Sequence, residues 1–186
     1  MTGELYATDA SMYEIQPEAV LIPKHAADVQ VALEVADDYN VPVLPRGGGS
    51  SLAGQTVGAA LIIDFTKHLD QILEINADEQ WARVQPGVVL DLLNEAAAEH
   101  GLMVGPDPAP SSRATLGGML ANNSTGTHSV RYGNFIHHIR SAEVLLADGT
   151  AATFEPLDHD GWQQRMRQNG RQGAIYRSLD ALLAEQ

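Results

Sequence analysis

The sequence predicts an α+β fold, in which short strands and amphipathic helices share one chain. Apolar runs occupy residues 19–22 and 60–65, and both have the length of a buried strand rather than of a helix. Apolar residues recur at helical spacing over residues 25–39 and 89–100. With 186 residues, the chain is long enough to bury a hydrophobic core.

The first predicted elements are a strand, a helix and a second strand. The run at residues 19–22 ends at Pro23, where a strand would stop. We expect Asn40 to close the helix that follows. Residues 41–44 return to a strand, and Pro42 places it at a sheet edge or marks a strand start, because proline lacks a ladder donor. The helix over residues 25–39 is indicated by Val29, Ala32, Leu33 and Ala36, at i, i+3, i+4 and i+7.

A glycine-rich turn, residues 45–56 with the sequence PRGGGSSLAGQT, separates two predicted strands. Its three consecutive glycines and two serines can place several backbone N–H groups around one small concavity, because no side chain blocks the approach and glycine reaches positive φ without strain. Such a concavity binds anions. A plain flexible loop is the alternative, but Pro45 and Arg46 fix the entry to the turn and favour the anion site.

Two known phosphate loops do not match this turn. The triphosphate loop requires a lysine, and Gln55 stands at that position in the stretch from Gly49 to Thr56. The dinucleotide fingerprint that would begin at Gly47 requires a third glycine where Leu52 stands. We therefore favour a diphosphate held mainly by backbone N–H groups, and a triphosphate hydrolase stays as a disfavoured alternative.

The middle of the chain contains a predicted hairpin, a helix and a long small-residue stretch. Residues 72–75 and 81–85 are expected to pair as strands, and Gly101 is expected to stop the helix over residues 89–100. In residues 105–126, alternating prolines stiffen an extended segment and paired glycines allow close backbone approach. A stretch of about twenty residues is long for a surface loop in a compact domain, so its length indicates a function.

The last part of the chain is expected to hold a second hairpin and a helix. Residues 142–147 should pair with residues 150–154 through a two-residue turn at Asp148 and Gly149. Apolar residues at helical spacing within 175–183 mark the final helix. Because its apolar face needs a partner surface, we expect the natural protein to continue beyond this segment.

Composition narrows the possible partners. A net charge of −13 argues against nucleic acid, which requires clustered Lys and Arg. The absence of cysteine excludes disulfides, thiolate zinc sites and cysteine-ligated iron–sulfur clusters within these residues. His137 and His138 would point to opposite faces of a strand, with no carboxylate cluster nearby, so we expect no metal site. Without a signal segment or a long apolar run, a soluble cytoplasmic chain without a membrane span is expected.

Seven short motifs occur in order along residues 17–155. They are PRGGGSS at 45–51 with Gly54-Gln55, Pro86-Gly87-Val88, Pro106-Asp107-Pro108, LGGM at 116–119, ANN at 121–123, RYG at 131–133 and LADG at 146–149. Together they resemble the FAD-binding domain of the vanillyl-alcohol oxidase and p-cresol methylhydroxylase flavoprotein superfamily. Within it, the chain is most similar to the branch of D-lactate dehydrogenase, D-2-hydroxyglutarate dehydrogenase and the glycolate oxidase flavin subunit.

The resemblance implies two α+β subdomains with FAD lying extended between them, in a fold that is incomplete at the C-terminus. We accordingly expect an N-terminal lead-in at residues 1–16, a first FAD-binding subdomain at residues 17–86, and a truncated second one at residues 87–186. The glycine loop would hold the pyrophosphate through backbone N–H groups, and the second region would line the cofactor. The expected cofactor-binding residues are Arg46, Gly47, Gly48, Gly49, Ser50, Ser51, Gln55, Pro108, Ala109, Pro110, Thr115, Gly117, Gly118, Asn123 and Gly126.

The resemblance also implies a chemistry. Some relatives attach the flavin covalently through a histidine in the glycine loop, but Ser50 occupies that position here, so the FAD should be dissociable. The full-length protein is expected to oxidise a 2-hydroxy acid such as D-lactate or glycolate and to pass electrons to an iron–sulfur or other acceptor module. The catalytic residues are expected mostly in a later domain and stay unknown. The alternative is a regulatory domain or fragment that keeps the fold without independent FAD binding or catalysis.

Overall fold

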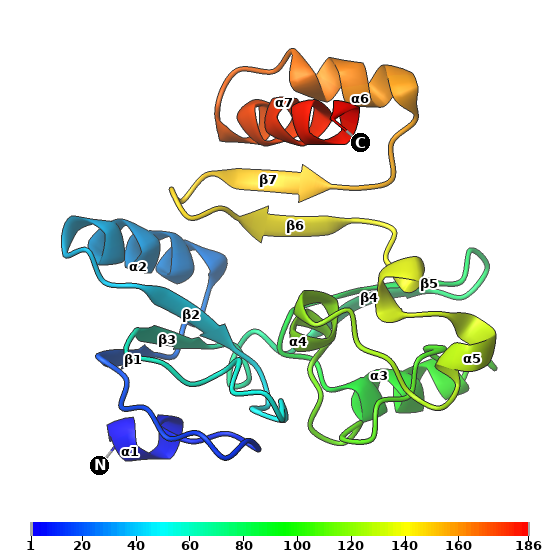
Figure 1. The fold of residues 1–186 in the computed structure, drawn as a ribbon. Coiled ribbons are helices and arrows are strands. Elements are labelled where there is room, and N and C mark those ends of the chain that lie inside the picture. The colour runs from blue at the N-terminus through cyan, green and yellow to red at the C-terminus, as the bar shows by residue number, and fades with distance from the viewer. Residues whose placement is uncertain (1, 186) are drawn as a thin grey trace. The chain divides into compact units, whose positions relative to one another are not determined.

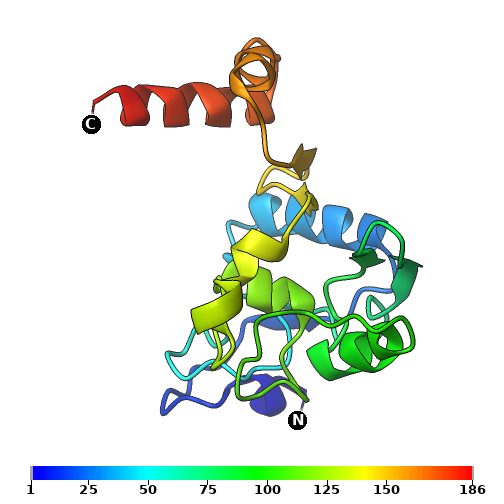
Figure 2. The ribbon, with the colours of Figure 1, turned by 90° about the vertical axis from the view of Figure 1, so that its right-hand side faces the viewer.

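A computed structural model describes residues 2–185 as a mixture of helices and short strands (Figures 1 and 2). Contacts divide the chain into two compact units, one ending at His138 and the other beginning at Ile139. Each unit is described by itself below. The expected subdomain boundary between residues 86 and 87 lies inside the first unit and stays a prediction, as does the lead-in at residues 1–16.

The first unit contains a three-stranded parallel sheet in the order β1-β3-β2. Its strands are β1 (Ala19–Leu21), β2 (Val43–Arg46) and β3 (Leu61–Asp64). The central strand β3 buries Ile62 and Ile63 almost completely. The three predicted strands are confirmed, and β2 lies at an edge of this sheet, as Pro42 indicated.

Helix α2 (Ala26–Asp38) connects β1 to β2 and lies over one face of the sheet (Figure 1). It buries Val29, Ala32 and Ala36, which belong to the predicted apolar stripe. Asn40 follows the helix with φ +51° and donates its N–H to the carbonyl of Asp37 at 3.0 Å. The helix end predicted at Asn40 is therefore confirmed, and the left-handed conformation turns the chain into β2.

Beyond the sheet, α2 and the N-terminal helix α1 (Thr2–Tyr6), the described part of the first unit holds a hairpin and four helical segments. Strands β4 (Ile72–Asn76) and β5 (Trp81–Val84) pair antiparallel, and helix α3 (Leu90–Ala98) is followed by Gly101 at φ +69°, all as predicted. The short segments α4 (Leu116–Ala121), α5 (Ser129–Tyr132) and the 3-10 helix η1 (Phe135–His138) were not predicted.

One expectation about this region is wrong, because His137 and His138 do not lie on a strand. The small-residue stretch at residues 105–126 contains α4, which was not predicted. Its paired glycines disfavour a helix, but Thr115 begins it by accepting a hydrogen bond from the Gly118 N–H at 3.3 Å. His137 and His138 lie in η1 rather than on a strand, and His138 Nε2 lies 3.0 Å from the Tyr132 carbonyl oxygen.

The second unit contains β6 (Ala142–Leu145), β7 (Ala151–Phe154), α6 (His159–Met166) and α7 (Arg171–Ala184). The two strands pair antiparallel, as predicted, and α7 matches the predicted last helix. The turn between the strands differs from the expected two-residue form. Leu146 and Thr150 form the last backbone hydrogen bond, at 2.9 Å, and Gly149 adopts φ +75°, so the loop has the three-residue form with glycine in the left-handed conformation.

Aromatic side chains form the centre of the second unit. Tyr176 of α7 is buried, with its ring centroid 6.1 Å from that of Phe154 and 4.9 Å from that of Trp162. Leu182 and Leu183 on the same helix are exposed.

Over residues 2–185, no helix has the length and apolar character needed to cross a membrane.

The N-terminal segment is attached to the parallel sheet through a tyrosine. Tyr6, at the end of α1 (Thr2–Tyr6), donates its hydroxyl hydrogen to Asp64 Oδ2 at 2.6 Å. Asp64 is buried at the end of β3 and also accepts hydrogen bonds from the N–H and hydroxyl of Thr66 at 2.7 Å. Burial and the hydrogen bond to Asp64 raise the pKa of Tyr6 to about 12.

A Tyr6→Phe variant tests this attachment through its pH dependence. Loss of a hydrogen bond to a charged group should lower the free energy of unfolding at neutral pH by about 1.5–3 kcal/mol. Because the pKa rises from 10.0 to about 12 on folding, the contribution of Tyr6 is complete below pH 10 and is lost as the pH rises through 12. In urea denaturation between pH 7 and 12, the free energies of unfolding of the Tyr6→Phe variant and of the unsubstituted chain should converge as the pH rises. The Tyr39→Phe control is altered at an exposed site, so its free energy of unfolding should follow the same pH dependence as that of the unsubstituted chain. A difference in free energy of unfolding for Tyr6→Phe that stays constant with pH would contradict the account.

Candidate functional site

The glycine-rich turn and the small-residue stretch meet in one cleft of the first unit. One wall comes from the turn that follows β2, and the other comes from the proline segment, α4 and the residues after it. The lining residues are Gly47, Gly48, Gly49, Ser50, Ser51, Thr56, Pro108, Pro110, Ala114, Thr115, Gly118, Met119, Asn122 and Ser124. The two regions singled out in the sequence therefore belong to the same site.

Gly47 and Gly48 let the two walls come into contact. A Cβ atom added at Gly47 would collide with Oγ1 of Thr115, and one added at Gly48 would collide with the carbonyl oxygen of Arg113. Any larger residue at either position would push the walls apart. The first two glycines of the turn are therefore needed to assemble the cleft, in addition to leaving space in front of it.

The turn presents a row of backbone donors without protein partners. Within residues 2–185, none of the five N–H groups from Gly47 to Ser51 donates a hydrogen bond to a protein acceptor. All five residues line the cleft. Because Gly49 adopts φ +63°, the chain changes direction within the row. Successive unpaired N–H groups in such a turn form an anion site.

The opposite wall uses its own donors internally. At the start of α4, the N–H of Leu116 donates to the Val88 carbonyl at 2.8 Å, and the N–H of Gly117 donates to the Pro86 carbonyl at 2.9 Å. The Gly118 N–H is bonded to the Thr115 hydroxyl. The backbone N–H groups at the start of α4 are therefore bonded within the protein, whereas those of the glycine turn are not.

The cleft is lined by neutral residues. None of its lining residues is an acid, a base or a histidine, so hydroxyl, amide and backbone groups are the polar groups available. Arg46, which begins the turn, directs its guanidinium to the carbonyl oxygens of Thr8 at 2.8 Å and Thr56 at 3.0 Å. A cleft of this kind can hold an anionic ligand through dipoles, but it offers no side chain for proton transfer near neutral pH.

Nine of the fifteen predicted site residues line the cleft. They are Gly47, Gly48, Gly49, Ser50, Ser51, Pro108, Pro110, Thr115 and Gly118. The other six lie outside the lining set. Among them, Gln55 donates from Nε2 to Asn122 Oδ1 at 3.2 Å, Ala109 is exposed, and Gly117 packs on Pro86. Their assignment as ligand contacts stays a prediction.

Asn123 and Gly126 support the segments behind the second wall. Asn123 has φ +46°, and its Oδ1 accepts the N–H of Ile136 at 3.0 Å. A Cβ atom at Gly126 would collide with the backbone carbonyl of Asp107. Both residues thus hold the chain around α4, and the close packing at Gly126 brings Asp107 to the following segment.

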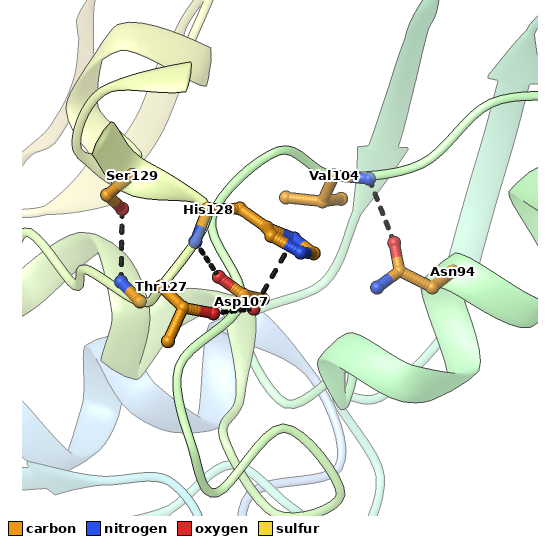
Figure 3. A network of polar contacts seen from close by, with 7 residues as sticks. Asn94, Val104, Asp107, Thr127, His128 and Ser129 are labelled. Carbon is orange, nitrogen blue, oxygen red and sulfur yellow. Dashed lines mark hydrogen bonds and ion pairs between the residues drawn. The ribbon is translucent and has the colours of Figure 1, made fainter. Parts of the chain in front are cut away.

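Asp107 fastens the proline segment to residues 126–129 (Figure 3). Its two carboxylate oxygens accept hydrogen bonds from the Thr127 hydroxyl and from the N–H of His128, both at 2.6 Å. The Thr127 hydroxyl and the His128 N–H lower the pKa of Asp107 below its usual value. The carboxylate is therefore ionised at neutral pH and holds the second wall in place from outside the cleft.

Five lining residues were not predicted from the sequence, namely Thr56, Ala114, Met119, Asn122 and Ser124. A helical signal for two of them was present. Met119 and Asn122 follow Thr115 and Gly118 at i, i+3, i+4 and i+7, which is one face of a helix. The spacing was not taken as helical, because Gly117 and Gly118 disfavour a helix.

Comparison with known proteins relates the chain to flavin-binding sequences. The profile of a family described as FAD binding domain matches residues 17–155. A D-2-hydroxyglutarate dehydrogenase from Pseudomonas putida is 37% identical over 95% of this chain and 18% of the relative. The mitochondrial D-lactate dehydrogenase [cytochrome] of Kluyveromyces lactis is 36% identical over 73% of this chain and 24% of the relative. Glycolate oxidase subunit GlcD of Bacillus subtilis is 36% identical over 78% of this chain and 31% of the relative.

Solved structures share the fold. A BBE-like 1 variant of Physcomitrella patens aligns with a TM-score of 0.71 and 24% identity, over 83% of this chain and 34% of that protein. An alkyldihydroxyacetonephosphate synthase aligns with a TM-score of 0.64 and 26% identity, over 74% of this chain and 26% of that protein. These likenesses confirm the predicted α+β fold of the p-cresol methylhydroxylase type. The chain spans less than a third of the length of each of the three sequence relatives.

A Gly48→Ala variant tests how the cleft is assembled. The added methyl group would meet the Arg113 carbonyl, so we expect the free energy of unfolding to fall by about 1–3 kcal/mol. Gly58→Ala is the matched control, because its Cβ would make only ordinary contact, 3.4 Å from a Leu44 methyl group. Urea denaturation should show a change within about 0.5 kcal/mol for the control. Equal losses in the two variants would mean that the contact at Gly48 does not assemble the walls.

Proposed function

The chain belongs to the family of FAD binding domains, and from that premise we propose that the cleft in its first unit holds the diphosphate of FAD. The observation that carries the proposal is the row of five N–H groups from Gly47 to Ser51, which have no protein acceptor within residues 2–185. A diphosphate supplies oxygen acceptors along such a row. The neutral lining is compatible with this ligand, because it contains no carboxylate that would repel a diphosphate.

Each wall would have a distinct part in binding. The glycine turn would donate hydrogen bonds to phosphate oxygens, and Ser50 and Ser51 would add hydroxyl groups beside them. The small residues of the second wall, Thr115 and Gly118 among them, would allow an extended ligand to lie close to the backbone. Bound FAD supplies a hydride acceptor that amino-acid side chains cannot provide.

We further propose that FAD is held without a covalent bond. No residue that lines the cleft is a histidine or a cysteine, and the sequence contains no cysteine. Ser50, in the middle of the turn, has no nucleophilic nitrogen or sulfur to attach to the flavin. Binding therefore rests on hydrogen bonds and packing alone.

For the full-length protein we propose an oxidoreductase that oxidises a 2-hydroxy acid. The three sequence relatives bear the names of D-2-hydroxyglutarate dehydrogenase, D-lactate dehydrogenase and glycolate oxidase. Since the cleft contains no group for proton transfer at neutral pH, the substrate-binding and proton-accepting residues are expected outside it. An iron–sulfur or other module that accepts the electrons remains part of the proposal.

The second candidate is a domain that keeps the fold without binding FAD by itself. The observation that favours it is the extent of the match, because this chain covers 18% of the P. putida relative. A ligand as long as FAD could require contacts from other parts of a protein of that length. The two candidates differ in one measurable quantity, the affinity of this chain for FAD.

Equilibrium titration with FAD separates the two candidates. We expect quenching of flavin fluorescence with a dissociation constant of about 1 μM or below. Riboflavin, which lacks the diphosphate, is the matched control ligand and should bind at least about tenfold more weakly, a difference of about 1.4 kcal/mol. Absence of FAD binding would favour the second candidate. Equal affinity for riboflavin would contradict diphosphate binding by the glycine turn.

Acid precipitation of the FAD-loaded chain tests the noncovalent attachment. Because no lining residue can bond to the flavin, we expect all of the yellow chromophore in the supernatant and an unchanged mass for the protein in mass spectrometry. Flavin that stays with the precipitated protein, or a mass increase equal to FAD, would contradict this part of the proposal. The protein without added FAD serves as the mass reference.

A further inference from the structure

The N-terminal segment packs directly against the glycine turn through Arg46. The guanidinium donates from Nη2 to the Thr8 carbonyl at 2.8 Å and from Nη1 to the Tyr6 carbonyl at 3.3 Å. Nη1 also donates to the carbonyl of Thr56, at the far end of the turn, at 3.0 Å. The same group lies 5.3 Å from the centroid of the Tyr6 ring, within the range of a cation–π contact.

Two further contacts attach the same segment to the turn. The Thr56 hydroxyl donates to Asp9 Oδ2 at 2.9 Å, and the N–H of Ala10 donates to the Gly49 carbonyl at 3.0 Å. The segment is therefore connected to the start, the middle and the end of the turn. Asp9 itself is fixed, because its Oδ1 accepts the N–H of Ser11 at 2.8 Å.

These contacts bear on the conformational freedom of the turn. A chain with three consecutive glycines loses much backbone entropy when it is ordered. A ligand that orders such a turn has to supply this free energy from its own interactions. In this chain the N-terminal segment holds the turn in place without a ligand. The five unpaired N–H groups of the turn therefore have a fixed arrangement before a ligand binds.

The charges of Arg46 and Asp9 are directed to this scaffold rather than to the cleft. Arg46 is outside the set of lining residues, and its guanidinium bonds carbonyl oxygens of the N-terminal segment and of the end of the turn. Burial raises the pKa of Asp9, but the hydrogen bonds from Ser11 and Thr56 outweigh it and leave the pKa below its usual value. Asp9 is thus a carboxylate at neutral pH, held by the segment and by the turn.

We propose that residues 6–10 are a positioning element for the glycine turn, and that Arg46 and Asp9 are positioning residues that set the affinity for FAD without touching it. The inference rests on the function proposed above and deepens it. It reassigns Arg46, which the family resemblance places among the cofactor contacts.

Two substitutions separate positioning from direct attraction of the diphosphate. Arg46→Lys keeps the positive charge but loses the planar fork that reaches three carbonyl groups. Asp9→Ala removes a negative charge near the cleft together with the hydrogen bond to Thr56. If charge alone mattered, the first variant would bind FAD normally and the second would bind it more tightly. Positioning predicts that both bind it more weakly.

The dissociation constant for FAD is measured for each variant under conditions where circular dichroism shows it to be folded. We expect an increase of about tenfold or more in both variants, which corresponds to about 1.4 kcal/mol. Lys67→Met and Glu18→Ala, which remove charges from exposed residues without a side-chain partner among residues 2–185, should bind as the unsubstituted chain does. Normal binding by Arg46→Lys, or tighter binding by Asp9→Ala, would overturn the proposal. A purely structural role would lower the free energy of unfolding and leave the affinity of the folded chain unchanged, and that result would overturn it too.

A second readout needs no FAD. In ¹H–¹⁵N spectra of the ligand-free chain labelled at glycine, both Arg46→Lys and Asp9→Ala should shift the amide signals of Gly47, Gly48 and Gly49, and the two control variants should not. Unchanged signals would overturn the positioning role whether or not the chain binds FAD. If the unsubstituted chain binds no FAD, the proposed function of the chain fails, and the glycine signals still decide the positioning role.

Discussion

The contact of Gly47 and Gly48 with residues 113–115 is the constraint on which the cleft depends. It brings the turn after β2 against the residues before α4, although more than sixty positions separate them in the sequence. Neither glycine can carry a side chain there, because a Cβ would enter Thr115 or the Arg113 carbonyl. The two glycines therefore allow the two walls of the cleft to pack together, and the open space of the cleft results from that packing.

Each wall is held by hydrogen bonds to regular structure outside the cleft. The turn leaves the edge strand β2, whose parallel pairing with β3 extends to Arg46 opposite Asp64. The second wall is held by residues 86–90, since Leu90 donates to the Ala114 carbonyl at 2.9 Å and Leu116 donates to the Val88 carbonyl at 2.8 Å. Within residues 2–185, the five N–H groups of Gly47–Ser51 have no protein acceptor in this frame, and this is a suitable arrangement for an anion.

The sequence predicted the framework well, because strands and long helices have apolar periodicity. The strands at residues 19–22 and 60–65 and the helix at residues 25–39 were recognisable from that pattern alone. The short helix α4 was not, since Gly117 and Gly118 disfavour a helix. The Thr115 cap, backbone pairing to residues 86–90 and the burial of Leu116 and Met119 stabilise it. Long-range contacts of this type leave no periodic signal.

In the site, too, the features that depend on local sequence were predicted, and those that depend on contacts between distant residues were not. The turn was predicted as part of the site from its glycines and serines, and nine of the predicted residues line the cleft. The hydrogen bonds of Arg46 could not be predicted from the sequence, because its acceptors include the backbone carbonyls of Tyr6 and Thr8, and backbone groups leave no side-chain pattern. An arginine beside a phosphate loop is naturally taken for a phosphate ligand, and only the fold shows that its fork is occupied elsewhere.

The central claim is that backbone N–H groups of the glycine turn hold the diphosphate of FAD. A crystal structure of the FAD-loaded protein tests it most directly. The account predicts phosphate oxygens within about 2.7–3.2 Å of backbone nitrogen atoms of Gly47–Ser51, with the Arg46 guanidinium still bonded to Tyr6 and Thr8. A diphosphate bound by the Arg46 side chain, or bound away from the turn, would contradict it.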